Sequence, residues 1–512
     1  MSDQSTYSVS RLRSGLRHLL LGKGASALCG FALFVLVARL LSIPEYGVYV
    51  TLVAGIDLAV ALSTVGVDWV TVRYLPEYRL SAGKRAFVRF LAGVAALRLL
   101  TLTILALALW VAMPVLLQYM HLGDYGVPAR LCVLILVSEG MARFLRDHML
   151  DSLLLQGRSQ LSLLTRSVTI LAVLGSENLT SGIVSLQTLV SIELGGSALG
   201  LTIAGVLLVR YLHADISGLE EKPVWNGPSI SQMAKMAIHN YFSLVLSLLY
   251  GSQVLMLIAS RELGVDRAAV FGFARNLSDQ VRRYLPASLF VGLIRPVVIA
   301  SFAQSRDFAR LNQQASLIYK VSVFALCPVL LAVAVFGGGI LDLLSNHKYG
   351  DAKAYVIALI AVLLPFSHRQ VLEMVVNTLN QPALWSRAAL SSLLILPLVI
   401  TLLALDWGIW GLIAAVGTGE VISNIVLVRG LRKAGYPYQV DYSGLLRIGT
   451  AVGLAYAALF AFREAAPTVI TLLAAVTGSL LGFLIAARLL RPFNAAERVM
   501  LGRIMPKWLL VW

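Results

Sequence analysis

Long apolar runs alternate with short polar connections along almost the whole chain. A helix needs about 20 apolar residues to cross a bilayer, because every backbone polar group must be bonded within the segment. By that measure the pattern predicts fourteen spanning helices. The predicted helices cover 16–41, 47–68, 87–117, 127–146, 160–175, 184–211, 234–258, 268–296, 314–336, 353–379, 387–405, 409–429, 444–463 and 467–490. The fifth has the weakest signal, since Arg166 lies near its start and "GSENLT" follows it.

Composition supports this interpretation. The 512 residues are 58% hydrophobic and only 13% charged, whereas soluble proteins carry about 25% charged residues. We therefore predict an all-α polytopic membrane protein. The net charge of +16 would in a soluble domain suggest nucleic acid, but the cations do not gather into such a domain, so no nucleic-acid partner is expected.

The connections alternate between basic and cation-poor segments. The basic set includes the N-terminus, "VRYLPEYRLSAGKR", "RGLRKAGYPYQV" and the C-terminal tail, whereas "SIPEY", "SRELGVD" and "LDWG" carry few cations. Cytoplasmic loops of membrane proteins are enriched in Lys and Arg. The pattern thus predicts that both termini are cytoplasmic, and the first apolar run reads as an uncleaved span rather than a signal peptide.

A weak internal repeat suggests two halves. At an offset of 222 residues Tyr49 aligns with Phe271 and Asp57 with Asp279, and at 224 Gln156 aligns with Asn380. The longest polar connector, "HADISGLEEKPVWNGPSISQ", falls between the sixth and seventh spans. We predict two six-helix lobes related by pseudo-two-fold symmetry. The expected organisation is a cytoplasmic N-terminus 1–15, an N-lobe 16–211, a cytoplasmic linker 212–233, a C-lobe 234–430, two additional helices 431–490 and a cytoplasmic tail 491–512.

The predicted eighth span contains an unusual group of charges. Arg275, Asp279 and Arg282 are spaced i, i+4, i+7 and share one helix face. Arg282 and Arg283 fall near the middle of the predicted span, where an arginine costs about 2.5–3.5 kcal/mol to insert. A planar guanidinium pairs with phosphate oxygens in a bidentate way, so these residues would line a cationic cavity for an anionic head group. The alternative is that Arg275 reaches the interface while Asp279 and Arg282 form a structural pair.

Other charges within predicted spans allow two interpretations each. Lys23 either faces the cavity or extends to the interface, and Arg39 either extends to the interface or contacts the ligand. Asp57, the repeat counterpart of Asp279, is either an ion-coupling site or a pair partner. Glu139 and Arg143, at i and i+4, form a self-contained pair by default.

A further set of charged residues lies in or beside the predicted spans without a single expected role. His368 stands beside Arg369 in the sequence, which makes it a poor proton carrier unless Glu373 offsets the cation. Glu420 serves coupling or packing. Candidate lining residues are Glu193, His239, His368, Arg369 and Glu373. Four cations are expected to act as topology determinants: Arg73, Arg79, Lys84 and Arg85.

No connection is long enough to form a domain that could hold a cofactor. The chain lacks a GxxxxGK[ST] phosphate loop and an HExxH motif, and its three cysteines lie far apart in apolar runs. We expect no cofactor and no metal. Energy would then come from an ion gradient with Na⁺ or H⁺ as the coupling ion, from the membrane potential, or from consumption of the product.

The segment "ARLLSIPEYGVYVTLVAGIDLAVALSTVGVDWVTVRYLPEYR" closely resembles the start of Wzx-type polysaccharide-export flippases. These proteins belong to the multidrug/oligosaccharidyl-lipid/polysaccharide exporter superfamily. "LLQGRSQLSLLTR" and "ILDLLSNHKYGDA" resemble two further connections of that family, although Ser42–Ile43 stand where it usually has glycine.

The resemblance implies a non-enzymatic flippase of the bacterial inner membrane. It would move an oligosaccharide repeat unit, linked to undecaprenyl diphosphate, by alternating access between two six-helix bundles arranged in a V. Expected partners are the lipid-linked oligosaccharide, membrane lipids, a polysaccharide polymerase and chain-length or export proteins.

Three alternative functions fit the sequence less well. A multidrug or cation antiporter of the same superfamily would need an acidic lumen, whereas the strongest mid-membrane cluster here is cationic. A peptidoglycan lipid-precursor flippase shares the fold, but the paired arginines of that branch after span two are not found. A membrane polymerase or glycosyltransferase would need a larger outer loop for its acceptor sugars.

Overall fold

The computed structural model describes residues 9–182, 184–214, 227–288, 298, 302, 305–462 and 468–504. Within these residues every element is helical and none is a strand. Eleven helical segments are long and apolar enough to cross a membrane, and the shorter apolar stretch Gly24–Leu40 ends the first helix. The predicted all-α multi-pass membrane fold is confirmed, while the count of fourteen spans stays a prediction. The helix that contains Arg166 is not among the eleven, in keeping with its weak signal.

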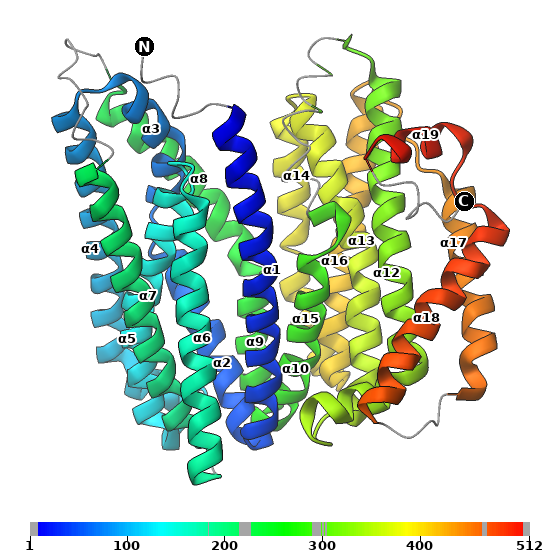
Figure 1. Cartoon of the computed structure of the whole chain (residues 1–512), viewed down its shortest axis with the longest axis horizontal. Coiled ribbons are helices and arrows are strands. Elements are labelled where there is room, and N and C mark those ends of the chain that lie inside the picture. Colours follow the sequence, from blue (N-terminus) through cyan, green and yellow to red (C-terminus); the bar gives the residue numbers. More distant parts are fainter. Residues whose placement is uncertain are drawn as a thin grey trace. The chain divides into compact units, whose positions relative to one another are not determined.

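The described chain forms two compact units, Met1–Ala269 (unit 1) and Val270–Trp512 (unit 2). Unit 1 contains the start of α10 and the helices α1 (Val9–Leu40), α2 (Ile43–Leu62), α3 (Val67–Ser81), α4 (Lys84–Tyr119), α5 (Gly126–Arg143), α6 (Gln156–Ser181), α7 (Leu186–Ala214), α8 (Ile230–Leu249) and α9 (Ser252–Leu263). Unit 2 contains most of α10 (Val265–Arg283) together with α12 (Phe308–Ser345), α13 (Lys353–Thr378), α14 (Pro382–Ser392), α15 (Ile395–Ala404), α16 (Gly408–Lys433), α17 (Tyr442–Leu459), α18 (Val469–Leu490) and α19 (Ala495–Ile504) (Figure 1).

In unit 1, α5 packs against α4 and α7, and α1 packs against α6. A buried cluster joins Phe87 and Leu91 of α4 to Phe144, Met149 and Tyr211. Helices α8 and α9 group with this unit because α9 packs along α2 and the Tyr241 hydroxyl donates to the Leu62 carbonyl at 2.8 Å. The division between units therefore falls inside α10, and residues 215–226 of the predicted linker lie outside the described residues.

The turn between α2 and α3 requires a glycine. Gly66 has φ +80°, a left-handed backbone conformation, and a Cβ there would lie 2.3 Å from the carbonyl oxygen of Ala237 on α8. Only a residue without a side chain permits both the conformation and this approach. The turn thereby fixes how closely α8 packs on the α2–α3 corner.

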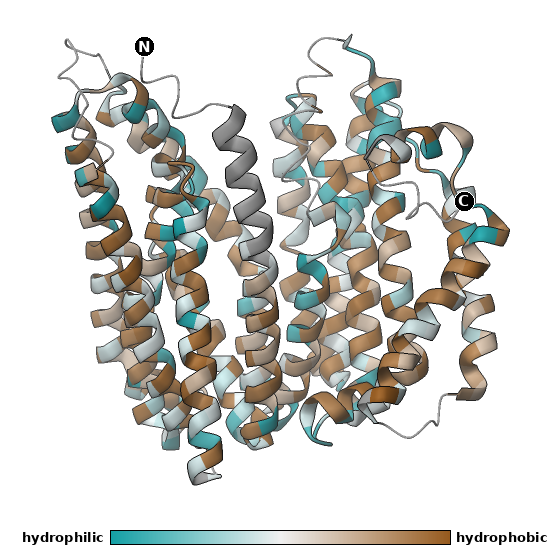
Figure 2. Cartoon of the chain, viewed as in Figure 1, coloured by the Kyte–Doolittle hydropathy of each residue, from teal (hydrophilic) through white to brown (hydrophobic). Residues whose placement is uncertain are grey.

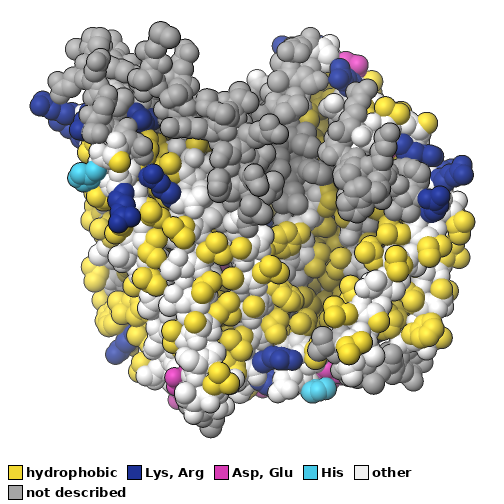
Figure 3. All heavy atoms as spheres, in the orientation of Figure 1, with side chains coloured by type: hydrophobic (Ala, Val, Ile, Leu, Met, Phe, Trp, Pro, Cys, Tyr) yellow, Lys and Arg dark blue, Asp and Glu magenta, His cyan; other side chains and the backbone are white. Residues whose placement is uncertain are grey.

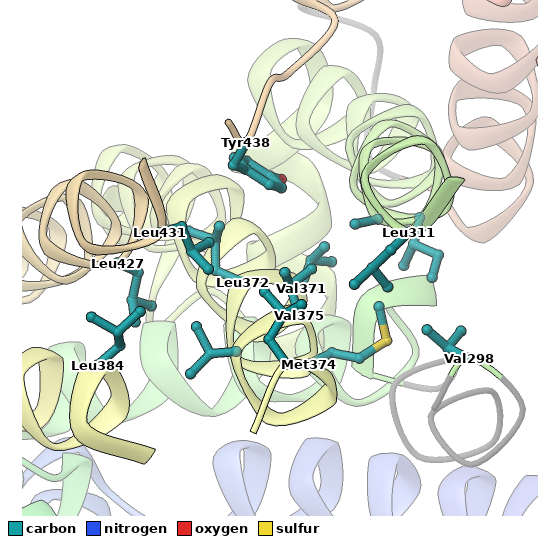
Figure 4. Packing of buried hydrophobic residues seen from close by; sticks show 14 of the residues in the cluster. Val298, Leu311, Val371, Leu372, Met374, Val375, Leu384, Leu427, Leu431 and Tyr438 are labelled. Atoms are coloured by element: carbon teal, nitrogen blue, oxygen red, sulfur yellow. The ribbon is translucent and has the colours of Figure 1, made fainter. Parts of the chain in front are cut away.

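In unit 2, α13 is the central helix and packs against α12 and α16. Figure 4 shows Val371, Leu372 and Val375 of α13 packed with Leu311 of α12 and Leu427 of α16 in a buried hydrophobic cluster. A second cluster holds α17 and α18 against α12. These apolar contacts form the scaffold that carries the charged groups described below.

The outer surface of the helices is apolar. Hydrophobic residues cover most of the length of α4, and hydrophilic ones gather toward the helix ends (Figure 2). The side chains of Leu107, Val111 and Val115 on α4 are 62%, 79% and 69% exposed. On the face shown in Figure 3, hydrophobic side chains dominate the middle and Lys and Arg lie mostly nearer the upper and lower margins. Such a surface requires hydrocarbon as its solvent.

The predicted eighth span is wrong in its extent. The pattern predicts an unbroken helix over 268–296, but α10 ends at Arg283, and Leu285 is not helical. Pro286 explains the break, because a proline disfavours helical backbone at the preceding residue and supplies no N–H to continue the ladder. Arg282 and Arg283 consequently occupy the last turn of α10 rather than the middle of a continuous helix.

Candidate functional site

The face predicted for α10 is present in the structure. Arg275 Nε lies 3.5 Å from Asp279 Oδ2, and Arg282 Nη1 lies 3.4 Å from Asp279 Oδ1. One carboxylate therefore bridges two guanidiniums. The Arg282 side chain remains 46% exposed, against 18% for Arg275, so Arg282 is the more accessible of the two cations. Its neighbour Arg283 is exposed as well.

Helices α13 and α16 continue this charged surface. Phe366 of α13 lies under the guanidinium of Arg282 at 4.7 Å and under that of Arg369 at 5.3 Å. Arg369 pairs with Glu373 one turn along α13 and donates from Nε to Glu420 Oε2 of α16 at 2.6 Å. Aromatic rings attract cations through their negative faces, so Phe366 contacts the guanidiniums of both arginines.

We call these seven residues the α10–α13 charge cluster: Arg275, Asp279, Arg282, Phe366, Arg369, Glu373 and Glu420. Its three arginines are matched by three carboxylates, and exposed Arg283 adds a further cation at the end of α10. All of these charged residues are among those predicted from the sequence, with Glu420 expected to serve either coupling or packing. The structure brings Glu420 onto Arg369, an arrangement that the sequence did not indicate.

His368 lies apart from this cluster. Its Nε2 is 3.2 Å from the Tyr438 hydroxyl, and its ring stacks on Tyr319 with centroids 4.6 Å apart. Successive residues on a helix point about 100° apart, so the cation of Arg369 projects from another face. The expected influence of Arg369 on His368 is therefore replaced by packing against two tyrosines.

Unit 1 contains a second charged network. Arg143 donates from Nη1 to Asp57 Oδ1 at 2.7 Å and from Nε to Glu139 Oε1 at 3.0 Å. The predicted Glu139–Arg143 pair is present, but it is not self-contained, because Asp57 joins it. Of the two interpretations offered for Asp57, the structure contains the pair; a role in ion coupling is not tested by it.

Glu139 is the centre of this network. Its side chain is buried, and Arg146 donates to Oε1 at 3.0 Å. Arg166 Nε lies 3.0 Å from Oε2, but its hydrogen is directed at the Ser197 hydroxyl, 3.2 Å away, so this contact is ionic without being a hydrogen bond. Three arginines thus surround one carboxylate. Arg146 lies i+7 from Glu139 on the same helix face, a spacing from which this pair could have been predicted, whereas no pattern in the sequence indicates Arg166 as a partner of Glu139.

Glu193 on α7 is the remaining acid of unit 1 among the residues predicted from the sequence to lie in the site. It is 7% exposed and accepts a hydrogen bond of 2.7 Å from the Tyr49 hydroxyl of α2. Among the described residues no ion pair of Glu193 is found. It is a buried carboxyl whose direct donor is neutral, in contrast to Glu139.

The other predicted residues lie elsewhere. Arg39 is exposed in the last turn of α1, and the side chain of Lys23 lies outside the described residues. His239 is exposed on α8. Arg73 pairs with Glu77 at the surface, whereas Arg79 is buried and donates to the Tyr211 hydroxyl at 2.8 Å. Arg79 thus stabilises packing of α3, beyond any part in topology.

Besides Arg146, two more buried cations among the described residues were not singled out from the sequence. Arg98 on α4 is 1% exposed, donates to the Ser63 hydroxyl and the Val60 carbonyl, and lies 3.8 Å from Asp68. Lys320 on α12 is equally buried and is held by Glu497 of α19, at 2.7 Å, and by Asp441.

Asp441 caps the start of α17, outside the spanning segments. Partial burial works to raise the pKa of its carboxyl, but hydrogen bonds from Lys320, the Gly444 N–H and the Ser443 hydroxyl outweigh it and lower the pKa to about 2. Lys320, Asp441 and Glu497 therefore tie α12, α17 and α19 together through charge.

Within the described residues no group of His, Cys, Asp and Glu is placed to hold a metal ion. Cys132 and Cys327 are buried and Cys29 is half-buried, all as free thiols.

The sequence model of the family described as "Polysaccharide biosynthesis protein" matches residues 12–285, more than half of the chain. No relative is found among the curated proteins. Among solved structures, the chain is similar to lipid II flippase MurJ in an inward closed conformation, with a TM-score of 0.68, 13% identity, and coverage of 92% of this chain and 98% of that one.

Two transporters of the multidrug MATE family are similar as well. The inward-facing structure of one has a TM-score of 0.56 at 16% identity and covers 80% of this chain and 94% of its own. A MATE protein in a bent conformation has a TM-score of 0.55 at 12% identity, with coverage of 85% and 97%. At these identities the likeness concerns the fold.

Proposed function

The chain belongs to the polysaccharide biosynthesis protein family, and from that premise we propose that it flips a lipid-linked oligosaccharide across the membrane. The cargo would be a repeat unit on undecaprenyl diphosphate, moved from the cytoplasmic to the outer leaflet of the bacterial inner membrane for an O-antigen, capsule or exopolysaccharide. Both termini would lie in the cytoplasm. A fold shared with MurJ and MATE proteins supports a transporter rather than an enzyme.

The observation that carries the proposal is the α10–α13 charge cluster. A diphosphate leaving water must exchange its hydration for fixed donors, and guanidiniums provide planar, charge-assisted hydrogen bonds to phosphate oxygens. Arg282 is half-exposed on the ring of Phe366, and Arg283 is exposed beside it. These two cations would meet the diphosphate.

In the absence of cargo, the carboxylates of the cluster would pair with its arginines. Asp279 lies 3.4–3.5 Å from both Arg275 and Arg282, longer than a strong charge-assisted hydrogen bond of about 2.7–2.9 Å. A phosphate oxygen can therefore take the place of Asp279 on Arg282 at low cost. Arg369 is held more tightly by Glu420, at 2.6 Å, and its two carboxylate partners more than offset its charge, so the positive charge for the diphosphate would come from Arg282 and Arg283.

The energy source would be a gradient or the consumption of product. Asp57 and Glu193 of unit 1 are the acids that we assign to coupling with H⁺ or Na⁺, since Asp57 is half-exposed beside Arg143 and Glu193 has only a neutral donor. Partners in the membrane would be a polysaccharide polymerase and chain-length or export proteins.

The proposal is tested by the double variant Arg282→Ala/Arg283→Ala in a strain that depends on this protein. We expect surface polysaccharide to fall at least about tenfold at unchanged protein level, since each lost charge-assisted contact is worth about 1.5–3 kcal/mol. Arg282→Lys/Arg283→Lys should give an intermediate level, because lysine keeps the charge and loses the planar fork.

The matched control is Arg73→Ala, which removes an arginine that is 59% exposed on α3 and pairs with Glu77. It should leave polysaccharide near the wild-type level. Wild-type polymer from the double alanine variant would contradict the assignment of Arg282 and Arg283 to the cargo.

A further inference from the structure

A groove of about 930 Å³ lies within unit 2 between α13 and α16, near the upper end of the volumes typical of ligand sites. The residues that line it between the helices include the small Ala358 and Ala361 of α13 and Ala414 and Gly417 of α16, beside larger ones, Val362, Pro365, Ile413, Thr418 and Val421. Its rim is formed by Asp406 and Trp407 from the turn before α16 and by Trp410 from its first turn. Small side chains leave room for a bulky occupant between the two helices.

The groove leads along α13 toward the α10–α13 charge cluster. Ala358, Val362, Pro365 and Arg369 recur at i, i+4, i+7 and i+11 and so share one face of the helix. Arg369 in turn pairs with Glu420 of α16, the other wall of the groove. From Ala358 to Arg369 the helix rises about 16 Å at 1.5 Å per residue. The aromatic rim and Arg369 thus lie toward opposite ends of the surface between α13 and α16.

The rim combines exposed aromatic faces with a carboxylate. Trp407 is 52% exposed and Trp410 is 43% exposed. Trp410 packs on Tyr355 of α13 with ring centroids 5.0 Å apart, which limits its rotation. Asp406 is exposed, and among the described residues it has no ion pair or side-chain hydrogen bond. An indole packs on apolar surface and leaves its edge for hydrogen bonds.

A sugar ring has the chemistry that such a rim recognises. One face of a pyranose presents C–H groups that pack on an indole, and its hydroxyls donate hydrogen bonds to a carboxylate. A hydrocarbon chain would leave Asp406 without a partner. Tryptophans that only anchor a protein at the membrane interface face lipid head groups, whereas these two line a concave groove.

We propose that the α13–α16 groove is a saccharide subsite. It holds sugar rings of the cargo against Trp407 and Trp410, with hydroxyls on Asp406, while the α10–α13 charge cluster holds the diphosphate. The inference rests on the proposed function and adds the part of the site that recognises the sugars. Because Trp410 packs on Tyr355, the rim lies about 21 Å along α13 from Arg369 at 1.5 Å per residue, so the cargo must be an oligosaccharide to reach from the charge cluster to the rim.

The test compares the binding of two lipids to the purified full chain in nanodiscs. One is undecaprenyl diphosphate, and the other is the lipid-linked oligosaccharide extracted from cells that lack this protein. We expect the oligosaccharide to tighten binding at least about tenfold, equivalent to about 1.4 kcal/mol, and Trp407→Leu/Trp410→Leu to abolish that gain. Binding of undecaprenyl diphosphate by the same variant should be unchanged, which also shows that the variant is folded.

The matched control is Trp110→Leu on α4, because Trp110 is exposed to the same 43% as Trp410 and lies in unit 1. It should keep the full gain from the sugars. A gain that persists in Trp407→Leu/Trp410→Leu, or equal affinity of the wild-type protein for the two lipids, overturns the saccharide subsite and leaves the flippase proposal standing. Failure of both lipids to bind wild-type protein overturns the two proposals together.

A second measurement separates the groove from a membrane anchor. In a variant whose only tryptophans are Trp407 and Trp410, fluorescence should be quenched by aqueous iodide, and the oligosaccharide lipid should protect it. Stronger quenching by brominated lipids than by iodide, unaffected by the ligand, would assign both rings to the lipid interface and overturn the proposal.

Discussion

At the scale of single residues, some charged side chains of this protein are enclosed by partners of opposite charge, and others remain partly exposed. Glu139 is surrounded by Arg143, Arg146 and Arg166 within 3.0 Å. Arg282, by contrast, is half-exposed and lies 3.4 Å from its acid. A buried charge that loses its partner lowers the free energy of unfolding. The enclosed charges should therefore govern stability, and the exposed ones should govern ligand binding.

Glu139→Gln tests the first half of this division. It leaves three guanidiniums around a neutral side chain, and we expect a loss of about 3–5 kcal/mol in stability, seen as a lower midpoint of thermal unfolding in detergent. Glu77→Gln, which breaks the exposed Arg73–Glu77 pair, should cost no more than about 1 kcal/mol. Equal midpoints for the two variants would show that the buried network contributes nothing.

Asp441 predicts a specific acid sensitivity. A carboxyl whose pKa is lower in the folded than in the unfolded chain stabilises the fold above the unfolded value and loses that contribution on protonation. With an ordinary pKa of 3.8 lowered to about 2, the contribution of Asp441 is lost as pH falls from about 4 to about 2. Thermal midpoints measured across this range should fall less steeply for Asp441→Asn than for the wild type. Parallel curves would contradict the assignment.

At the scale of helices, most boundaries follow from apolar runs and turn residues visible in the sequence. Ser42 and Glu45 form a capping box at the start of α2, and Pro286 ends α10, a signal that a count of apolar residues passes over. Tertiary partners were harder to predict. Lys320 lies in an apolar run, and its acids are 121 and 177 residues away in the sequence. Periodicity cannot reveal partners on other helices.

Helix packing also depends on Gly47 of α2. A Cβ at this position would lie 2.0 Å from the carbonyl oxygen of Val265 at the start of α10, within unit 1. Gly47→Ala should therefore force the helices apart and cost about 1–3 kcal/mol. Gly55→Ala on the same helix meets no atom within 4 Å and should preserve or slightly raise stability. The midpoints of thermal unfolding of the two purified variants measure this difference in stability. Equal midpoints for Gly47→Ala and Gly55→Ala would contradict the prediction.

At the scale of the whole molecule, the class and the family followed from composition and from the segment 38–79, because hydrophobicity and connection charge are properties of the chain alone. The α10–α13 charge cluster was predicted in its members and only partly in its contacts. His368 and Arg369 are neighbours in the sequence, but His368 contacts Tyr438 and Arg369 pairs with Glu420. Arg282 lies in the last turn of α10, although the hydropathy pattern predicts that this helix continues to residue 296. The contacts of the cluster depend on the direction of each side chain and on where a helix breaks, and the hydropathy pattern reports neither.

Orientation in the membrane is a prediction of the connection charges. Alkaline phosphatase fused after Asp124 should be active, because that connection is predicted to face the periplasm, and a fusion after Arg432 should be inactive. Green fluorescent protein at the C-terminus should fluoresce. The inverse pattern would place the basic connections outside and reverse the proposed direction of transport.

The most direct test of the central claim is translocation in proteoliposomes. Wild-type protein and Arg282→Ala/Arg283→Ala are reconstituted at equal density with fluorescently labelled lipid-linked oligosaccharide, and a membrane-impermeant reductant reports the fraction of label in the outer leaflet over time. The account predicts rapid exchange between leaflets with the wild-type protein and a rate at least about tenfold lower with the double variant. Equal rates for the two proteins, or a wild-type rate no higher than that of protein-free liposomes, would contradict it.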